Sequence, residues 1–149
     1  MTIQPLIPQL IGWGIQWISQ QRDLHRPFGR ELAQAEKGAF DLFFDRTTLD
    51  SVRLKWVQLL QNPPFYLQIQ QMGLPLIPFA DMDGITFADT ILLAQKGVRH
   101  EPPPPLPLLF HEMVHVVQYE VLGIETFVTR YVHGWSSRSP VCFRMDVAA

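Results

Sequence analysis

The most restrictive feature of this chain is an apolar segment, residues 106–122, that carries two histidines and a glutamate. Pro107 suits the first turn of a helix, and apolar residues follow it on nearly every side of the helix that the segment would form. A helix of that kind is normally buried in a protein core. The segment therefore predicts a buried helix, with Val114, Val117 and Val121 among the most buried residues.

The polar residues of this segment have the spacing of a metal site. His111 and His115 are four residues apart, so on a helix they face the same side, one turn apart. Two imidazoles held in this way can bind one zinc ion (Zn2+), and Glu112 can reach a water molecule on that metal. Zinc lowers the pKa of water toward neutrality, and a carboxylate can then take its proton. The pattern predicts His111 and His115 as metal ligands and Glu112 as the catalytic base for hydrolysis of peptide bonds.

The alternative is a purely structural pair of histidines in a core helix. Burying the two imidazoles and the Glu112 carboxylate without partners costs roughly 2–7 kcal/mol per polar group in an apolar medium. A bound metal ion removes most of this cost, which favours the zinc site.

Length and composition exclude several classes of protein. The 149 residues suit one domain, 47% of them are hydrophobic, and the net charge of −2 comes without any run of basic residues. We therefore expect no nucleic-acid interface. Cys142 has no partner for an internal disulfide, and prolines and glycines interrupt the apolar residues 1–20. We expect a cytoplasmic protein without a signal peptide or membrane span, whose partner is a peptide or protein substrate; the oligomeric state stays open.

Periodicity predicts a helix-dominant α+β domain over residues 1–149. Its N-terminal part, residues 1–44, should hold two helices, at about 5–21 and 27–44, joined by a polar connection at 22–26. The second helix should bury one apolar face. That face consists of Leu32, Ala35, Ala39, Phe40 and Phe43.

Strands are expected between residues 45 and 105, and helices after them. A turn at 47–50 precedes a strand at 52–56, and a short helix at 65–72 closes at Gly73. A tight turn at 81–84 leads to residues 85–93, which form one bent strand or a small hairpin, and prolines 102–105 form a stiff connector. The motif helix should end at Gly123. A second helix should follow at about 124–133, closed by Gly134, before an irregular tail at 135–149.

The extended motif HExxHVxQ, residues 111–118, resembles the DUF4157-type zincin metallopeptidases of bacteria. The strand at 84–87 and the aromatic segment at 62–66 are also similar, so the resemblance covers about residues 45–135. It implies a small zincin-like domain, with a minor β-sheet or hairpin beside the buried motif helix. It also implies a zinc peptidase with His111 and His115 as ligands and Glu112 as general base.

The resemblance also suggests roles for two neighbouring parts of the chain. Gln118 would orient a zinc ligand or touch the substrate; the alternative is a solvated or capping amide. An edge strand within residues 85–93 would pair with the backbone of an extended peptide.

The third zinc ligand stays undecided at this level. A catalytic zinc usually has three protein ligands and a water, but position 121 is valine where a metzincin has histidine. The candidates are Glu125, His133 and Asp146, and Glu125 can equally be a favourable charge at a helix N-terminus. Two functions therefore remain: an active zinc peptidase, and a non-catalytic or degenerate zincin-like domain that serves as a binding or assembly module.

Overall fold

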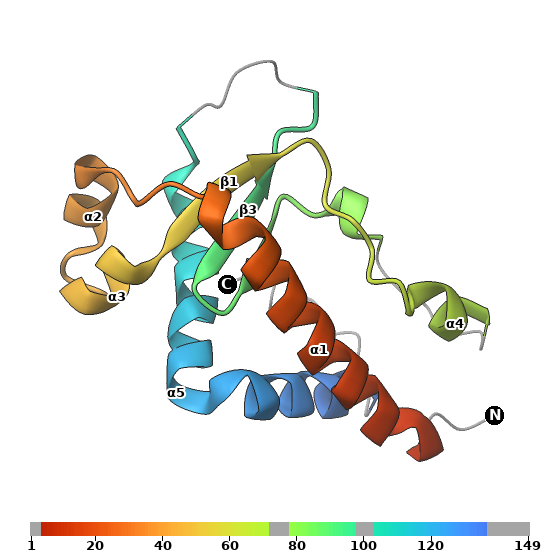
Figure 1. Cartoon of the computed structure of the whole chain (residues 1–149). Coiled ribbons are helices and arrows are strands. Elements are labelled where there is room, and N and C mark those ends of the chain that lie inside the picture. Colours follow the sequence, from red (N-terminus) through yellow and green to blue (C-terminus); the bar gives the residue numbers. More distant parts are fainter. Residues whose placement is uncertain (1–3, 72–77, 98–102, 137–149) are drawn as a thin grey trace.

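Helices and one small sheet make up the computed structural model (Figure 1), which describes residues 4–71, 78–97 and 103–136. The elements in chain order are η1 (Gln4–Leu6), α1 (Ile7–His25), η2 (Arg26–Phe28), α2 (Gln34–Phe40), α3 (Arg46–Ser51), β1 (Arg53–Val57), α4 (Tyr66–Gln71), η3 (Phe79–Asp81), β2 (Gly84–Phe87), β3 (Thr90–Ala94) and α5 (Leu106–Ser136). The predicted class, helix-dominant α+β, is confirmed for these ranges. Within them, no helix combines the length and apolarity needed to cross a lipid bilayer.

The sheet joins the predicted strand at 52–56 to a hairpin. β1 lies parallel to β3, and β2 runs antiparallel to β3 on the other side, so the strand order is β1-β3-β2. Ala88 has a φ of 58° in the tight connection between β2 and β3. Of the two predicted alternatives, a bent strand and a hairpin, the hairpin is the observed one. β3 is therefore the central strand, and β2 is an edge strand.

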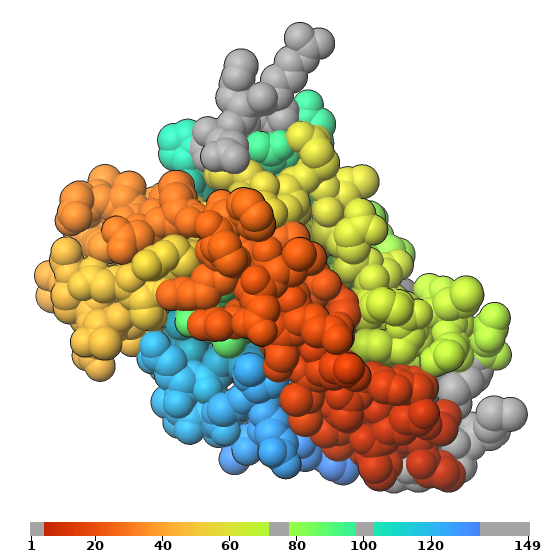
Figure 2. Space-filling view, viewed as in Figure 1, coloured from red at the N-terminus to blue at the C-terminus, as the bar shows by residue number. Residues whose placement is uncertain are grey.

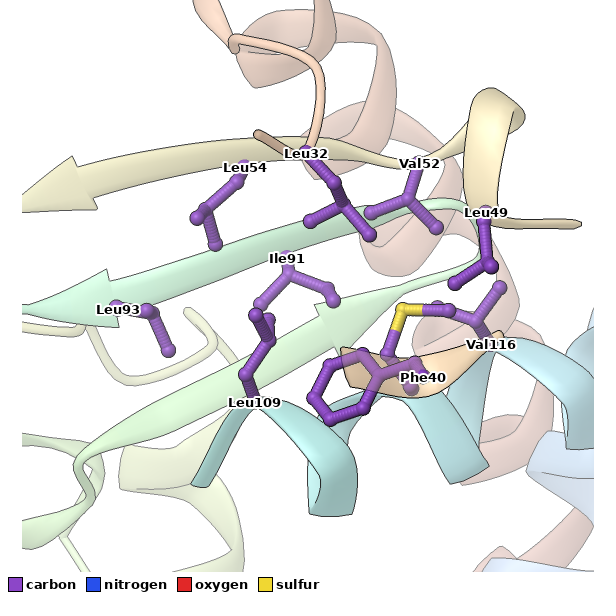
Figure 3. Packing of buried hydrophobic residues seen from close by; sticks show 10 residues of the cluster. Leu32, Phe40, Leu49, Val52, Leu54, Ile91, Leu93, Leu109 and Val116 are labelled. Carbon is purple, nitrogen blue, oxygen red and sulfur yellow. The ribbon is translucent and has the colours of Figure 1, made fainter. Parts of the chain in front are cut away.

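One face of α5 packs on this sheet and forms the main core. Leu109, Met113 and Val116 are fully buried, at the i, i+4, i+7 spacing of one helical face. They share a cluster with Ile91 and Leu93 of the central strand (Figure 3). The other buried members of the cluster are Leu32, Phe40, Leu49, Val52 and Leu54.

The predicted burial of the three valines of the motif helix is wrong. Val121 is 76% exposed, Val114 is also exposed, and Val117 is only half-buried. Val114 and Val121 lie about 80–100° round the helix from Met113, beyond the arc that meets the sheet. The sheet covers the helix from one side only, so an apolar sequence on the other side stays in contact with water.

The predicted helix at 27–44 is also wrong, because the chain first joins the sheet. After η2, Arg30 forms an antiparallel bridge with Leu54 of β1 through two backbone hydrogen bonds of 2.9 and 2.8 Å. Helix α2 begins only after this extended stretch, where the Glu36 carboxylate accepts the Ala33 N–H at 2.7 Å. The bridge lies far away in sequence, so the local pattern gives no sign of it.

The apolar face predicted for that helix is only partly buried. Leu32 and Phe40 are in the core, whereas Ala35, Ala39 and Phe43 are exposed. The turn predicted at 47–50 is instead the short helix α3.

Helix α1 extends through the polar residues 22–25 that were predicted as part of a connection. Its Arg22 binds both carboxylate oxygens of Asp89, in the β2–β3 connection, at 3.0 Å, and Arg26 lies 3.3 Å from the same carboxylate. Burial alone raises the pKa of Asp89, but the hydrogen bonds from Arg22 and Thr90 and the charges of Arg22 and Arg26 together outweigh burial, and the net pKa is below its ordinary value. Arg22, in this extension of the helix, thus has its partner on the hairpin.

Gly123 bends α5 into two limbs, as predicted. Its φ of 78° and ψ of 162° separate a first limb, residues 106–122, from a second limb, residues 124–136, which runs past the predicted end at Gly134. Figures 1 and 2 show the second limb turning under α1. Val128 and Val132 of this limb pack with Ile7 and Leu10 of α1. The short helix predicted at 65–72 is confirmed as α4, while Gly73 lies outside the described residues.

Two matched substitutions test how the first limb packs. Val116→Asp is expected to unfold the chain, because it places an unpaired carboxylate at a fully buried site, at a cost above about 4 kcal/mol. Val121→Asp, on the same limb, is expected to melt close to the wild-type temperature, because that site is in water. Thermal unfolding followed by circular dichroism compares the two. If Val116→Asp melts as the wild type does, the packing described here is incorrect.

Candidate metal centre

The two histidines of the motif converge on one point. His111 and His115 lie one turn apart on the first limb of α5, and their Nε2 atoms are 3.2 Å apart. Two nitrogens at about 2.0–2.1 Å from one tetrahedral zinc would be about 3.3–3.4 Å apart. The predicted geometry of the pair is therefore present, and its spacing fits two of the positions round a single zinc ion.

Gln118 holds one of these rings. His115 Nδ1 lies 2.8 Å from Gln118 Oε1, and since an amide oxygen only accepts hydrogen bonds, Nδ1 carries the proton. A neutral His115 then has its lone pair on Nε2, which is the atom that faces His111. Of the two readings of Gln118, this contact agrees with the one in which it orients a ligand.

Glu112 is buried against the edge strand of the sheet. The residue is only 3% exposed, and its Oε2 accepts a hydrogen bond of 2.6 Å from Thr86 Oγ1 in β2. A Cβ atom at Gly84 would lie 3.0 Å from Glu112 Oε1, so glycine is what lets the strand approach this closely. Tyr119 donates its hydroxyl to the Thr86 carbonyl at 3.2 Å. The phenol is protonated at neutral pH, and burial raises the pKa of Tyr119 further above its ordinary value.

Thr86 and Tyr119 are members of the candidate site that the sequence did not identify. Threonine is a common strand residue, and Tyr119 fits an apolar helix, so neither has a local signal of its own. Their contacts form only because β2 lies beside the first limb of α5. Thr86 and Glu112 are 26 residues apart in the chain, so the local sequence does not reveal this contact.

The third ligand is not among the predicted candidates that the structure describes. Within residues 4–71, 78–97 and 103–136, no three His, Cys, Asp or Glu side chains are placed to hold one ion. Glu125 and His133 lie on the second limb, both exposed, and are not brought to the histidine pair. Asp146 lies outside the described residues.

A cavity of about 610 Å³ adjoins these groups. His111, Glu112 and His115 line it, together with residues 84–87 of β2. An edge strand for peptide pairing was predicted within residues 85–93. Of these, only the β2 residues lie in an edge strand, because residues 90–93 belong to the central strand and pair on both sides. The arrangement brings the edge strand and the histidine pair to the wall of one cavity.

Comparisons with models of protein families, with curated proteins and with solved structures find no match to this chain. Its function has to be inferred from the geometry of its own residues.

Removing the side chain that holds His115 should weaken zinc binding. Gln118→Ala is expected to lower zinc affinity about 10–100-fold, because the ring loses the acceptor that fixes its tautomer and orientation. Competition with a chromophoric chelator measures the affinity. Glu120→Ala, at an exposed neighbour that bonds to Thr48 instead, is the control and should bind zinc as the wild type does. An unchanged affinity in Gln118→Ala would count against this role.

Removing the hydroxyl at Thr86 should destabilise the fold. Thr86→Val leaves the buried Glu112 carboxylate without this donor, at an expected cost of about 1–3 kcal/mol, whereas Thr86→Ser should restore most of the loss. Urea denaturation measures both. Thr48→Val is a matched control, because it breaks a 2.8 Å threonine–glutamate bond to the exposed Glu120, and should cost less. Equal losses at the two sites would refute a special role for Thr86.

Proposed function

We propose that this chain is a zinc-dependent peptidase that hydrolyses peptide bonds. One observation carries the proposal: the Nε2 atoms of His111 and His115 lie 3.2 Å apart, beside a buried glutamate and on the wall of one cavity. A core pair with a purely structural role would have no need to face a cavity. The resemblance of residues 111–118 to zincin peptidases points the same way.

Each residue of the motif has a distinct part in this reaction. His111 and His115 would hold the zinc ion, and Gln118 would keep the His115 lone pair on Nε2. Zinc, when bound, supplies Lewis acidity for the scissile carbonyl and lowers the pKa of water toward neutrality. Glu112 takes a proton from the attacking water as the carbon–oxygen bond forms, and gives a proton to the leaving amine as the carbon–nitrogen bond breaks.

The surroundings of Glu112 suit a general base that must stay in one place. The Thr86 hydroxyl fixes Oε2 of the carboxylate, and Gly84 leaves room beside Oε1. Because β2 is an edge strand, an extended peptide beside it would have its backbone within reach of the same cavity.

One observation favours a second candidate function, that of a non-catalytic zincin-like binding or assembly module. The described residues supply two histidine ligands and no third His, Cys, Asp or Glu to complete the site. A site with two ligands would bind zinc more weakly than the three-ligand sites of zinc enzymes.

Two substitutions separate metal binding from catalysis. Glu112→Gln should keep zinc at one ion per chain and lower hydrolysis about 10²–10⁴-fold, because an amide cannot take the proton. His115→Ala should lose the zinc itself. Elemental analysis and a mixed-peptide assay on the same samples measure both properties. His133→Ala and Glu125→Ala are controls that should keep the metal, and Asp146→Ala tests the candidate outside the described residues.

The outcomes distinguish the two functions. Equal hydrolysis by the wild type and Glu112→Gln would remove Glu112 from the mechanism. Zinc bound at one per wild-type chain, with no peptide cleaved, would favour the non-catalytic module.

A further inference from the structure

The cavity beside the histidine pair extends well beyond the space that a zinc ion and a water molecule need. Its volume of about 610 Å³ lies within the range of roughly 300–1,000 Å³ that is usual for ligand sites. Helix α1, the segment leading into α4, strand β2 and both limbs of α5 contribute to its wall. We call it the aromatic chamber, after the aromatic residues that line it, which include Trp17, Phe65, Tyr66, Phe87, Phe127 and Tyr131.

One wall of the chamber is a packed set of rings centred on Trp17 of α1. Its ring meets those of Phe87 and Phe79 edge-on, at centroid distances of 5.1 and 5.6 Å, and that of Phe65 at 6.4 Å. Edge-to-face pairs of this kind hold rings in defined positions. This wall is therefore built before any ligand arrives.

A second part of the wall begins at the histidine pair itself. Phe127 of the second limb stacks on Tyr119 at 3.9 Å, and its ring centroid is 6.2 Å from that of His115. Tyr131 continues the stack one turn further along the second limb. A ligand bound beside the two Nε2 nitrogens would therefore have this aromatic surface next to it.

The charges in the lining select against acidic groups. Among the described lining residues the acidic side chains are Asp81, Asp83 and Glu112, and there is no Lys or Arg. Asp81 and Asp83 are exposed, and Asp83 is 2.7 Å from Lys96. The interior is left to apolar and aromatic side chains, where a carboxylate would be desolvated without a basic side chain to pair with.

We propose that the aromatic chamber binds a large apolar side chain, aromatic or branched aliphatic, of the substrate residue next to the cleaved bond. This inference rests on the proposed peptidase function. The chamber opens on the same histidines and glutamate, it has room for a ring, and its lining buries apolar surface. A large apolar residue at this position should raise kcat/KM at least about 10-fold over alanine, and aspartate should lower it below alanine.

Val132→Phe is the test, because this nearly buried residue lines the chamber and a ring there takes up its space. Three peptides that differ only in Phe, Ala or Asp beside the bond are compared. Wild type should prefer Phe, and Val132→Phe should lower the ratio of kcat/KM on the Phe peptide to that on the Ala peptide at least about 10-fold. Val121→Phe, the same change at an exposed site outside the lining, should behave as the wild type.

A binding measurement without zinc tests ligand binding in the chamber independently of peptide hydrolysis. The neutral fluorescent probe N-phenyl-1-naphthylamine, added with a chelator, should bind the wild type and Val121→Phe at one per chain, and Val132→Phe at least about 10-fold more weakly. Should Val132→Phe fail to fold, Tyr131→Ala replaces it, because that side chain is exposed at the wall and its loss should weaken both the probe and the preference for Phe.

Three results would overturn the inference, and they show whether the chamber or the peptidase is wrong. Equal wild-type rates on the Phe and Ala peptides, or unchanged probe binding in the lining variant, would refute the chamber as a specificity site while the peptidase stands. Probe binding by a zinc-loaded wild type that cleaves no peptide would refute the peptidase, and the substrate assignment with it.

Discussion

The packing of one face of α5 on the central strand sets the position of everything else in the site. Leu109, Met113 and Val116 are fully buried against β3, which fixes the rotation of the first limb about its own axis. Successive residues of a helix are about 100° apart, so this rotation also decides where the motif residues lie. Glu112 comes next to the core face and meets β2, and the two histidines come further round, beside the cavity.

The same packing explains why a buried carboxylate is tolerated. Glu112 sits at the border between the apolar core and the edge strand, where Thr86 can donate to it. Tyr119, two turns along, ties the backbone of the same strand to the helix. Hydrogen bonds from helix and strand thus stabilise the polar border on which the proposed chemistry depends, since a buried ionised group without such donors is strongly disfavoured.

A bend and an ion pair place other elements beside the motif and so help to form the cavity. The positive φ at Gly123 directs the second limb under α1, and brings Phe127 to the ring of His115. Asp89, in the hairpin connection, binds Arg22 of α1 and so ties that helix to the sheet. Without the bend and this ion pair, the histidines would lie on an open helix surface rather than on the wall of an aromatic chamber.

Local sequence was sufficient wherever the deciding interaction lies within a few residues. The spacing of His111 and His115 put them on one helical face, Gly123 marked the bend, and the alternation at 52–56 marked a strand. Tertiary structure decided the rest. Arg30 pairs with Leu54 and interrupts the predicted helix, and Val121 is exposed although its neighbours are apolar. An apolar side chain lowers the free energy of the fold when it is buried. Whether another surface is there to bury it depends on contacts between residues far apart in the chain.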